Sequence, residues 1–378
     1  MSNVLKEVKK LGQIALVLQG GGALGAYQIG VFEALHEAGI EPDWVIGTSI
    51  GVINAAIIAG NPPADRLPRL VEFWKRVEQK QYPGMAENWF AAMTRNLQTV
   101  SQGLPGFFRP RHAAFISPHT VLGAEEAGYY SVDPLRETLS QLIDFDYLQK
   151  SKTRLTVGAS SVRNAEMKYF DSRSMPLQLE HIIASGALPP SFPAVRIDGE
   201  LYWDGGILSN TPVEVVFDDA PRRDSLVFAV HMWNPVGEEP ETIWQVINRQ
   251  KDIQYSSRAV SHIKRQRQMH KLRHIISEFG KLLPEGLLQK EGVAEMLGYG
   301  CNTTMHVARL LAPTLPGEDH LKDIDFSREG IRQRRESGYR DTFVLLEKSP
   351  WNARKDPLDG VILHEVRNGE LVEPLSGN

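Results

Sequence analysis

The sequence has a single cysteine, Cys301, among its 378 residues, and it has no long apolar run. One cysteine excludes an intramolecular disulfide framework and suits a reducing compartment, so we expect a cytoplasmic protein. Ile14 to Leu18 is too short for the apolar region of a signal peptide. Ile50 to Ala59 falls well below the roughly 20 residues that a membrane span needs. Any membrane contact is therefore expected to be peripheral.

A strong excess of one charge is also missing. The chain has 42 basic and 46 acidic residues and a net charge of −4, which gives no electrostatic case for a nucleic-acid partner. With 42% apolar and 23% charged residues, the composition is that of a globular protein. The length suits one large domain with insertions or two smaller domains. The oligomeric state is left open.

The pattern of strand, turn and helix occurs twice near the start of the chain. Ile14 to Leu18 is a predicted buried strand, followed by glycines and a predicted helix over Ala26 to Ala38. Trp44 to Ile46 and the small-residue stretch Ile50 to Ala59 repeat the pattern. Further strands are predicted at Leu155 to Ala159, Leu226 to His231 and His306 to Leu311. This repetition predicts an α/β fold of three layers, with a mainly parallel central sheet and helices on both faces.

Two regions depart from this pattern. Residues 68–119 scatter aromatic side chains among glycine, proline and arginine, and we expect either a lid over an apolar substrate or a helical elaboration that packs its aromatics inward. Residues 235–240 give a weak signal of a domain boundary. We therefore predict a domain over 10–235 and a helical extension over 236–378 that packs on it. Within the extension, Ser261 to Leu283 is a basic amphipathic helix that could lie on an anionic membrane, although a surface helix packed on the core is favoured. A short strand is expected at Thr342 to Leu346.

Each of the first two predicted strands ends in a glycine-rich turn. Gly20-Gly21-Gly22-Ala23-Leu24-Gly25 offers bare backbone N–H groups, and Gly47-Thr48-Ser49-Ile50-Gly51 has the spacing of a nucleophile elbow. Such an elbow holds a serine exposed on a strained bend, and the N–H of Ile50 would be an oxyanion donor at the positive end of the next helix. A dinucleotide site is the minor alternative, because Asp43 lies at the beginning rather than the end of the second strand.

A nucleophilic serine needs a base, and the sequence offers two kinds. His231, at the end of a predicted strand, is the best placed histidine, although an ordinary buried histidine is the safer interpretation. The second candidate is Asp204, which follows a hairpin signal at Asp198-Gly199 and precedes Gly205 and Gly206. In isolation, a plain turn with a capping aspartate is the favoured interpretation of this segment.

Taken together, the Gly20 to Gly25 loop, the Gly47 to Gly51 elbow and Asp204-Gly205-Gly206 resemble the patatin-like phospholipase family, in a bacterial subgroup with a C-terminal extension. The stretch Ala184 to Pro193 is similar to the segment that precedes the aspartate hairpin in that family. The resemblance covers about residues 14 to 215.

The resemblance implies a Ser-Asp dyad in a serine lipid acyl hydrolase, with no metal and no cofactor. Ser49 would be the nucleophile, Asp204 the base, and the N–H groups of Gly20, Gly21, Gly22 and Ile50 the oxyanion donors. The supporting glycines would be Gly25, Gly47, Gly51, Gly205 and Gly206. The substrate would be a phospholipid or a neutral lipid ester. Leu24, where the family usually carries a basic residue, argues against a phospholipid preference and leaves neutral esters and polyester-like acyl chains open. The alternatives are an acyltransferase of the acyl-carrier-protein transacylase type and a non-catalytic membrane-associated protein.

Overall fold

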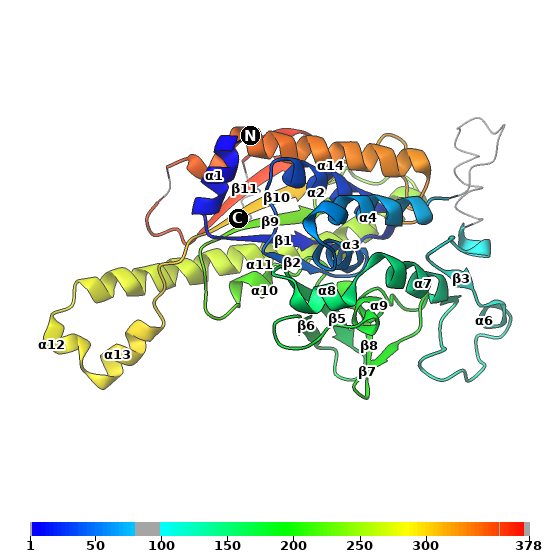
Figure 1. Ribbon diagram of the computed structural model, residues 1–378, viewed down its shortest axis with the longest axis horizontal. Coiled ribbons are helices and arrows are strands. Elements are labelled where there is room, and N and C mark those ends of the chain that lie inside the picture. Colours follow the sequence, from blue (N-terminus) through cyan, green and yellow to red (C-terminus); the bar gives the residue numbers. More distant parts are fainter. Residues whose placement is uncertain (1, 80–98, 355, 374–378) are drawn as a thin grey trace.

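The computed structural model describes residues 2–79, 99–354 and 356–373, and a sheet of ten strands forms its centre (Figure 1). In chain order the strands are β1 (Gln13–Leu18), β2 (Trp44–Gly47), β5 (Arg154–Ser161), β6 (Met167–Asp171), β7 (Val195–Ile197), β8 (Glu200–Asp204), β9 (Ser225–His231), β10 (Met305–Leu311), β11 (Val361–Arg367) and β12 (Glu370–Val372). In space their order is β12-β11-β10-β9-β1-β2-β5-β8-β7, and β6 pairs with β5. Five of the strands predicted from the sequence are present as β1, β2, β5, β9 and β10, each one to three residues longer than predicted.

The middle of the sheet is parallel and its rims are antiparallel. The pairs that join β11, β10, β9, β1, β2 and β5 are all parallel. The pairs that add β6, β7, β8 and β12 are antiparallel. Because parallel strands end at one edge, β1 and β2 bring the two glycine turns to the same edge of the sheet.

Side chains of β1 alternate between two apolar cores, one on each face of the sheet. Leu16 and Leu18 belong to the larger core, and Ala15 and Val17 to the smaller one. The larger core is covered by α1 (Ser2–Lys10), α2 (Ala26–Glu37), α3 (Ile50–Ala59), α4 (Pro63–Arg76), α7 (Asp133–Leu142), α8 (Phe145–Lys150), α9 (Leu179–Ser185) and α14 (Arg328–Lys348). The smaller core is covered by α10 (Glu214–Phe217) and the 39-residue helix α11 (Ile243–Lys281). The predicted three-layer α/β fold is confirmed.

The chain after residue 235 contributes strands as well as helices. It contains α11, α12 (Glu285–Leu288), α13 (Glu291–Gly298) and α14, and its strands β10, β11 and β12 extend the same sheet. The predicted strand at Thr342 to Leu346 is wrong, because this run lies within α14. A short apolar run fits a strand or a buried helix equally well, and here Thr342, Leu345 and Leu346 are buried at helical spacing.

The aromatic-rich region 68–119 is described in part. Tyr82, Trp89, Phe90 and Met93 lie outside the described residues. The remainder includes the end of α4, the strand β3 (Arg109–Pro110) paired with β4 (Tyr130–Ser131), and the short helix α6 (His112–Ile116). Phe107 contacts Phe73 and Phe326, so this aromatic ring packs inward. Among the described helices, none is long and apolar enough to cross a bilayer.

Helix α14 packs closely on α2, which begins where the first glycine loop ends. A Cβ atom at Gly30 would lie 1.8 Å from the carbonyl oxygen of Arg335, and one at Gly338 would lie 2.0 Å from that of Tyr27. The Tyr27 hydroxyl donates a hydrogen bond of 2.7 Å to the buried carboxylate of Asp341. These two glycines therefore allow a backbone contact that no larger residue fits.

Substituting Gly338→Ala should lower the free energy of unfolding by about 3 kcal/mol, because the methyl group forces the two helices apart. Gly292→Ala in α13 is the matched control, since nothing lies within 4 Å of its Cβ position. That control should be neutral or stabilising by up to about 1 kcal/mol. Urea unfolding monitored by circular dichroism measures both changes. Equal effects of the two substitutions would contradict the close packing.

Candidate functional site

The first glycine loop lies directly against Ser49. A Cβ atom at Gly20 would be 2.9 Å from the Cβ of Ser49 and 2.5 Å from Oδ1 of Asn210. A second close contact sits behind the serine, where a Cβ at Gly51 would lie 2.3 Å from the carbonyl oxygen of Leu18. The absence of side chains at Gly20 and Gly51 is therefore what brings the end of β1 and the start of α3 together.

Ser49 has the backbone strain expected of a nucleophile elbow. Its φ of 54° and ψ of −131° place a non-glycine residue in a disfavoured region. The bend is held because the N–H of Ser49 donates to the carbonyl oxygen of Ser185 at 3.0 Å. Gly47 is needed beside it, since a Cβ there would lie 2.6 Å from the backbone of Gly51. The surrounding contacts thus hold the Ser49 hydroxyl at the bend, half-buried.

Asp204, which lies near the middle of the chain, is brought beside this serine by the fold. Its side chain is only 2% exposed, and it accepts a hydrogen bond of 2.7 Å from the N–H of Gly206. Burial raises the pKa of the Asp204 carboxyl to about 7, and the neighbouring Ser49 hydroxyl and Gly206 N–H, which both lower this pKa, offset only part of the rise. Asp204 is therefore poised to gain or lose a proton near neutral pH.

The sheet positions Asp204 at the last residue of β8. Asp204 lies opposite Ala159 in the antiparallel pair with β5, and its N–H donates to the carbonyl oxygen of Ala187. Gly205 then crosses β5 closely, since a Cβ there would be 2.4 Å from the carbonyl oxygen of Gly158. The predicted hairpin through Asp198 is confirmed, and Asp204 follows it as expected.

Ser49 and Asp204 open into a cavity of about 260 Å³. Its polar groups gather at the serine, and the remainder of its wall is largely aliphatic and aromatic. The aromatic side chains in that wall are Phe107, Phe108, Tyr130, Phe192, Trp233, Tyr255 and Phe326. An apolar cavity with a few convergent polar groups is typical of a site for a ligand with a hydrocarbon portion.

The four predicted oxyanion donors differ in their hydrogen bonding. The N–H of Gly20 already donates to the carbonyl oxygen of Asn210 at 3.2 Å, which argues against its predicted role. Within the part of the chain that the structure describes, the N–H groups of Gly21, Gly22 and Ile50 donate to no protein acceptor. All three residues line the cavity beside Ser49.

Histidine plays no part in this constellation. His231 is buried, and burial together with Arg309 lowers its pKa well below the usual range. No histidine is among the described residues that line the cavity. The described residues also contain no group of three or more histidine, cysteine, aspartate or glutamate side chains that could hold a metal ion.

Comparison with known families identifies the fold around this site. A sequence model described as patatin-like phospholipase matches residues 16–217, more than half of the chain, and includes both Ser49 and Asp204. The chain belongs to the patatin-like phospholipase family. A second model, described as patatin phospholipase, matches residues 253–358.

Curated members of the patatin-like family that resemble this chain are much longer. Human patatin-like phospholipase domain-containing protein 6 is 30% identical over 205 residues, which make up 53% of this chain and 12% of that protein. Lysophospholipase nte1 of Aspergillus terreus is 43% identical over 89 residues, 23% of this chain and 5% of that protein. The chain thus spans only a small part of these relatives. The crystal structure of VipD from Legionella pneumophila aligns with a TM-score of 0.39 and 17% identity, covering 89% of this chain and 67% of VipD.

Several residues that support the patatin-like site escaped the sequence analysis. The carbonyl oxygen of Gly20 accepts hydrogen bonds from Trp233 Nε1 at 2.8 Å and from Asn210 Nδ2 at 3.1 Å. The buried side-chain oxygen of Gln19 accepts from the backbone N–H of Trp233 at 3.1 Å. These residues come from three distant parts of the chain, and no motif marks them.

Two adjacent ion pairs between α11 and residues 322–323 support the glycine loop. The N–H of Ala23 donates to the carbonyl oxygen of Asp323 at 2.8 Å. The Asp323 carboxylate is bound by Lys251 of α11 at 2.7 Å, and the neighbouring Lys322 binds Asp252 at 2.8 Å. We call these four residues the α11 clasp. It joins the region matched by the second family model to the loop beside Ser49.

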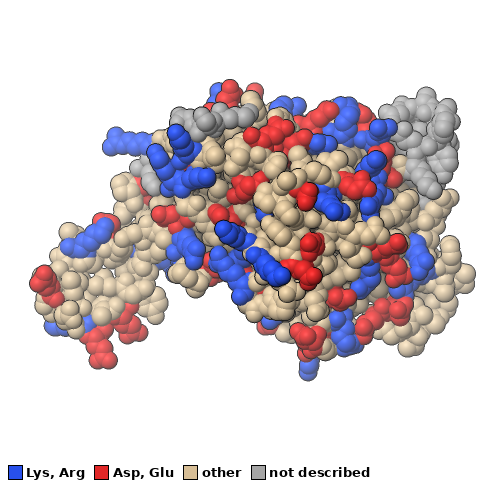
Figure 2. Space-filling view, in the orientation of Figure 1, with Lys and Arg blue, Asp and Glu red and all other residues tan. Residues whose placement is uncertain are grey.

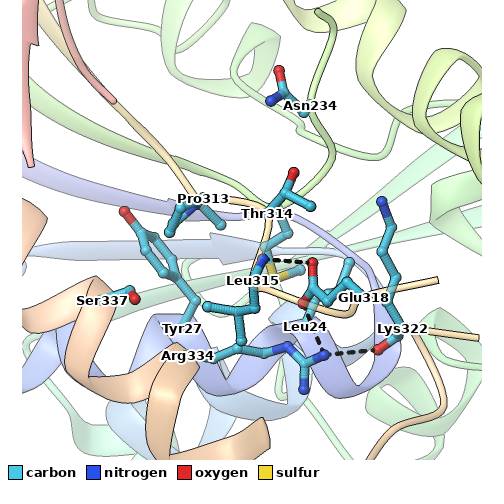
Figure 3. Close-up of a pocket in the computed structure, with 12 residues that line it drawn as sticks. Leu24, Tyr27, Asn234, Pro313, Thr314, Leu315, Glu318, Lys322, Arg334 and Ser337 are labelled. Atoms are coloured by element: carbon cyan, nitrogen blue, oxygen red, sulfur yellow. Dashed lines mark hydrogen bonds and ion pairs between the residues drawn. The ribbon is translucent and has the colours of Figure 1, made fainter. Parts of the chain in front are cut away.

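Leu24 faces away from the Ser49 cavity. It is 4% exposed and lines a separate cavity of about 10 Å³, drawn in Figure 3, together with Glu318, Lys322 and Arg334. Arg334 donates to Glu318 at 3.0 Å in this second cavity. The side chain at position 24 is therefore not part of the described wall of the larger cavity.

The raised pKa of Asp204 predicts a stability cost above pH 4. Between the unfolded pKa of 3.8 and the folded pKa of about 7, the folded protein holds a proton that the unfolded chain has lost. Stability therefore falls as pH rises through this window and levels off above it. Asp204→Asn removes this titratable group. The free energy of unfolding of the variant, relative to that of the wild type, should therefore increase by about 2 to 3 kcal/mol from pH 5 to pH 8. Urea unfolding at the two pH values measures it, and a pH-independent difference would contradict the raised pKa.

Proposed function

We propose that this protein is a serine lipid acyl hydrolase that uses Ser49 and Asp204 as a catalytic dyad. The observation that carries the proposal is the placement of a strained, elbow-held serine beside a buried carboxylate, whose pKa the serine hydroxyl lowers, in the wall of one apolar cavity. Membership of the patatin-like phospholipase family supports the same reaction class.

The reaction begins when Ser49 Oγ attacks the carbonyl carbon of the ester while Asp204 accepts the hydroxyl proton. The carbonyl oxygen becomes an oxyanion, for which the N–H groups of Gly21, Gly22 and Ile50 are the proposed donors. When the tetrahedral intermediate collapses, the bond to the alcohol breaks and Asp204 returns its proton to the leaving oxygen. The product of this half-reaction is an acyl-enzyme on Ser49.

A water molecule then repeats the sequence on the acyl-enzyme. Asp204 takes a proton from the water as it attacks, and it gives that proton to Ser49 Oγ when the acyl bond breaks. The released product is a carboxylic acid. An aspartate with a pKa near 7 is suited to both roles, because it accepts a proton far more readily than an aspartate in water.

The cavity favours a substrate with an acyl chain. Its aliphatic and aromatic wall would bury the hydrocarbon, and the ester would lie at Ser49. Both a phospholipid and a neutral ester fit this description. The acyl-carrier-protein transacylase alternative is weaker, since the serine of such enzymes is paired with histidine and none lines the described cavity.

We propose a cytoplasmic enzyme that meets its substrate at a membrane surface or in dispersed form. The low cysteine content supports the compartment, and a lipid substrate supports peripheral membrane contact. Of the predicted lid 68–119, residues 80–98 lie outside the described residues, and in this proposal the described segment 99–119 would cover the substrate, since Phe107 and Phe108 belong to the cavity wall.

Ser49→Ala should abolish both fluorophosphonate labelling and hydrolysis of p-nitrophenyl esters, because it removes the nucleophile. Asp204→Asn should lower kcat by about 10³-fold or more, because the base is lost. In the wild type, kcat/KM should rise with pH through about 7 as the Asp204 carboxyl loses its proton.

Ser140→Ala and Asp146→Asn, both at exposed positions, are the matched controls and should leave the rates unchanged. A wild type that neither labels nor turns over would refute the proposal.

Lys251→Met should lower kcat by about tenfold with little change in KM, because it releases Asp323 and loosens the loop that carries Gly21 and Gly22. Lys281→Met, which breaks an exposed ion pair in the same helix, is the control. Steady-state kinetics with a short-chain ester separates kcat from KM. An unchanged kcat in Lys251→Met would show that the α11 clasp does not position the oxyanion loop.

A further inference from the structure

The C-terminal half of α11, α12 and α13 form an arm that projects from the body of the molecule, in yellow at the lower left of Figure 1. In Figure 2 the same arm is a separate lobe joined to the body by a narrow neck. Its two ends meet at the body, where the N–H of Cys301 donates to the carbonyl oxygen of Arg273 at 3.2 Å. We define the arm as residues 275–300.

No residue of the arm is buried. The helices α12 and α13 bury nothing, although they contain leucine, valine and methionine. Phe279 is 65% exposed, Leu282 79% and Tyr299 67%. Helices as short as these need tertiary packing to be stable in water. The apolar surface of the arm therefore calls for a partner.

Four exposed apolar residues at the C-terminal end of α11 have the spacing of a coiled-coil seam. Leu272, Ile275 and Phe279 of α11 and its C-cap Leu282 follow one another at spacings of three, four and three, which is the a and d pattern of a heptad repeat. All four are exposed. A helix that lies on a membrane presents a wider apolar face, whereas so narrow a seam is suited to a second helix.

The charges of the arm are complementary to those of the preceding part of α11, residues 261–277, which we call the stem. Residues 261–277 contain five lysine or arginine residues and no acidic residue, whereas residues 278–299 contain four glutamates and two lysines. An antiparallel copy of the same helix would bring the acidic end of one arm to the basic stem of the other. The seam is self-complementary in that arrangement, because Leu272 would face Leu282 and Ile275 would face Phe279 of the second copy.

The position of the arm also argues against a lipid partner. In Figure 1 the arm projects from the end of the molecule opposite to β3, whose neighbours Phe107 and Phe108 line the Ser49 cavity. A membrane that bound the arm would therefore lie at the end of the molecule away from this part of the cavity wall. The four glutamates near the end of the arm would further oppose an anionic surface.

We propose that the arm is a dimerisation element, through which two copies of this chain pair antiparallel about a twofold axis. The interface is isologous, so each copy supplies the same seam and the same charged ends. This inference does not depend on the proposed hydrolase activity.

Sedimentation velocity of the full chain should show a dimer in the micromolar range. Phe279→Asp, which places a charge in the seam, should raise the dimer dissociation constant at least tenfold while leaving circular dichroism and p-nitrophenyl ester hydrolysis unchanged. Val121→Asp, at an apolar residue that is 96% exposed outside the arm, is the matched control and should remain dimeric. A monomeric wild type, or a Phe279→Asp variant that dimerises as tightly as the wild type, would overturn the proposal.

A charge-reversal experiment tests the antiparallel pairing. Lys264→Glu, Arg265→Glu and Arg267→Glu together change the net charge of residues 261–277 from +5 to −1, and Glu285→Lys with Glu291→Lys changes that of residues 278–299 from −2 to +2. Each of these two variants alone should be monomeric, because like charges then face each other. An equimolar mixture of the two should form a heterodimer in which both contacts are complementary. Failure of the mixture to dimerise would overturn the antiparallel arrangement.

Cross-linking checks the register of the seam. In a Cys301→Ser background, chains with Ile275→Cys and chains with Phe279→Cys should form a mixed disulfide faster than either forms with itself. A parallel pairing would instead favour self-cross-linking at each position and would overturn the proposal. Co-sedimentation with phosphatidylglycerol vesicles tests the lipid alternative. Vesicle binding that is lost in Phe279→Asp, with no dimer in solution, would assign the arm to the membrane.

Discussion

The contact between Gly51 and the carbonyl end of β1 is the constraint on which the site depends. A parallel sheet brings the ends of β1 and β2 to one edge, but it leaves room between the turns that follow them. Because Gly51 has no side chain, α3 starts directly against Leu18, and Ser49 is pressed against Gly20. The strained backbone of Ser49 is a consequence of this packing.

The carboxylate that meets Ser49 is costly to the fold. Asp204 is buried, and its N–H and side chain are held by backbone groups of Ala187 and Gly206 rather than by a cation. A nearby lysine or arginine would lower the pKa of this carboxyl and make it a weaker base. The fold thus accepts a destabilising group where a proton acceptor is useful, as functional sites commonly do.

The C-terminal part of the chain completes the structure around the patatin-like core. Helix α14 packs on α2 through Gly30 and Gly338, and α2 follows directly from the glycine loop. The α11 clasp binds the other side of that loop through Asp323. The strands β10, β11 and β12 extend the central sheet. The two halves of α11 therefore have different roles, since the first half supports the glycine loop and the second half leads into the arm.

Local patterns in the sequence determined the strands β1, β2, β5, β9 and β10, the two glycine turns and the hairpin before Asp204. Each of these depends on residues close together in the chain: an apolar run, a glycine at a tight turn, or Asp-Gly between two strands. The same patterns failed at Thr342 to Leu346, where an apolar run fits two structures and packing against α2 selects the helix. They also missed Asn210, Trp233 and Asp323, whose contacts with the glycine loop join distant parts of the chain.

By itself, then, the sequence determined the fold class and the residue types at the site, and its motifs resembled the family to which the chain belongs. Only the tertiary structure decided that Ser49 and Asp204 lie in the wall of one cavity, that burial moves the carboxyl pKa to about 7, and that Gly20 has no free N–H. The physical reason is that burial and long-range hydrogen bonding are properties of the packed chain. A motif specifies which atoms are available, and packing specifies their distance and their access to water.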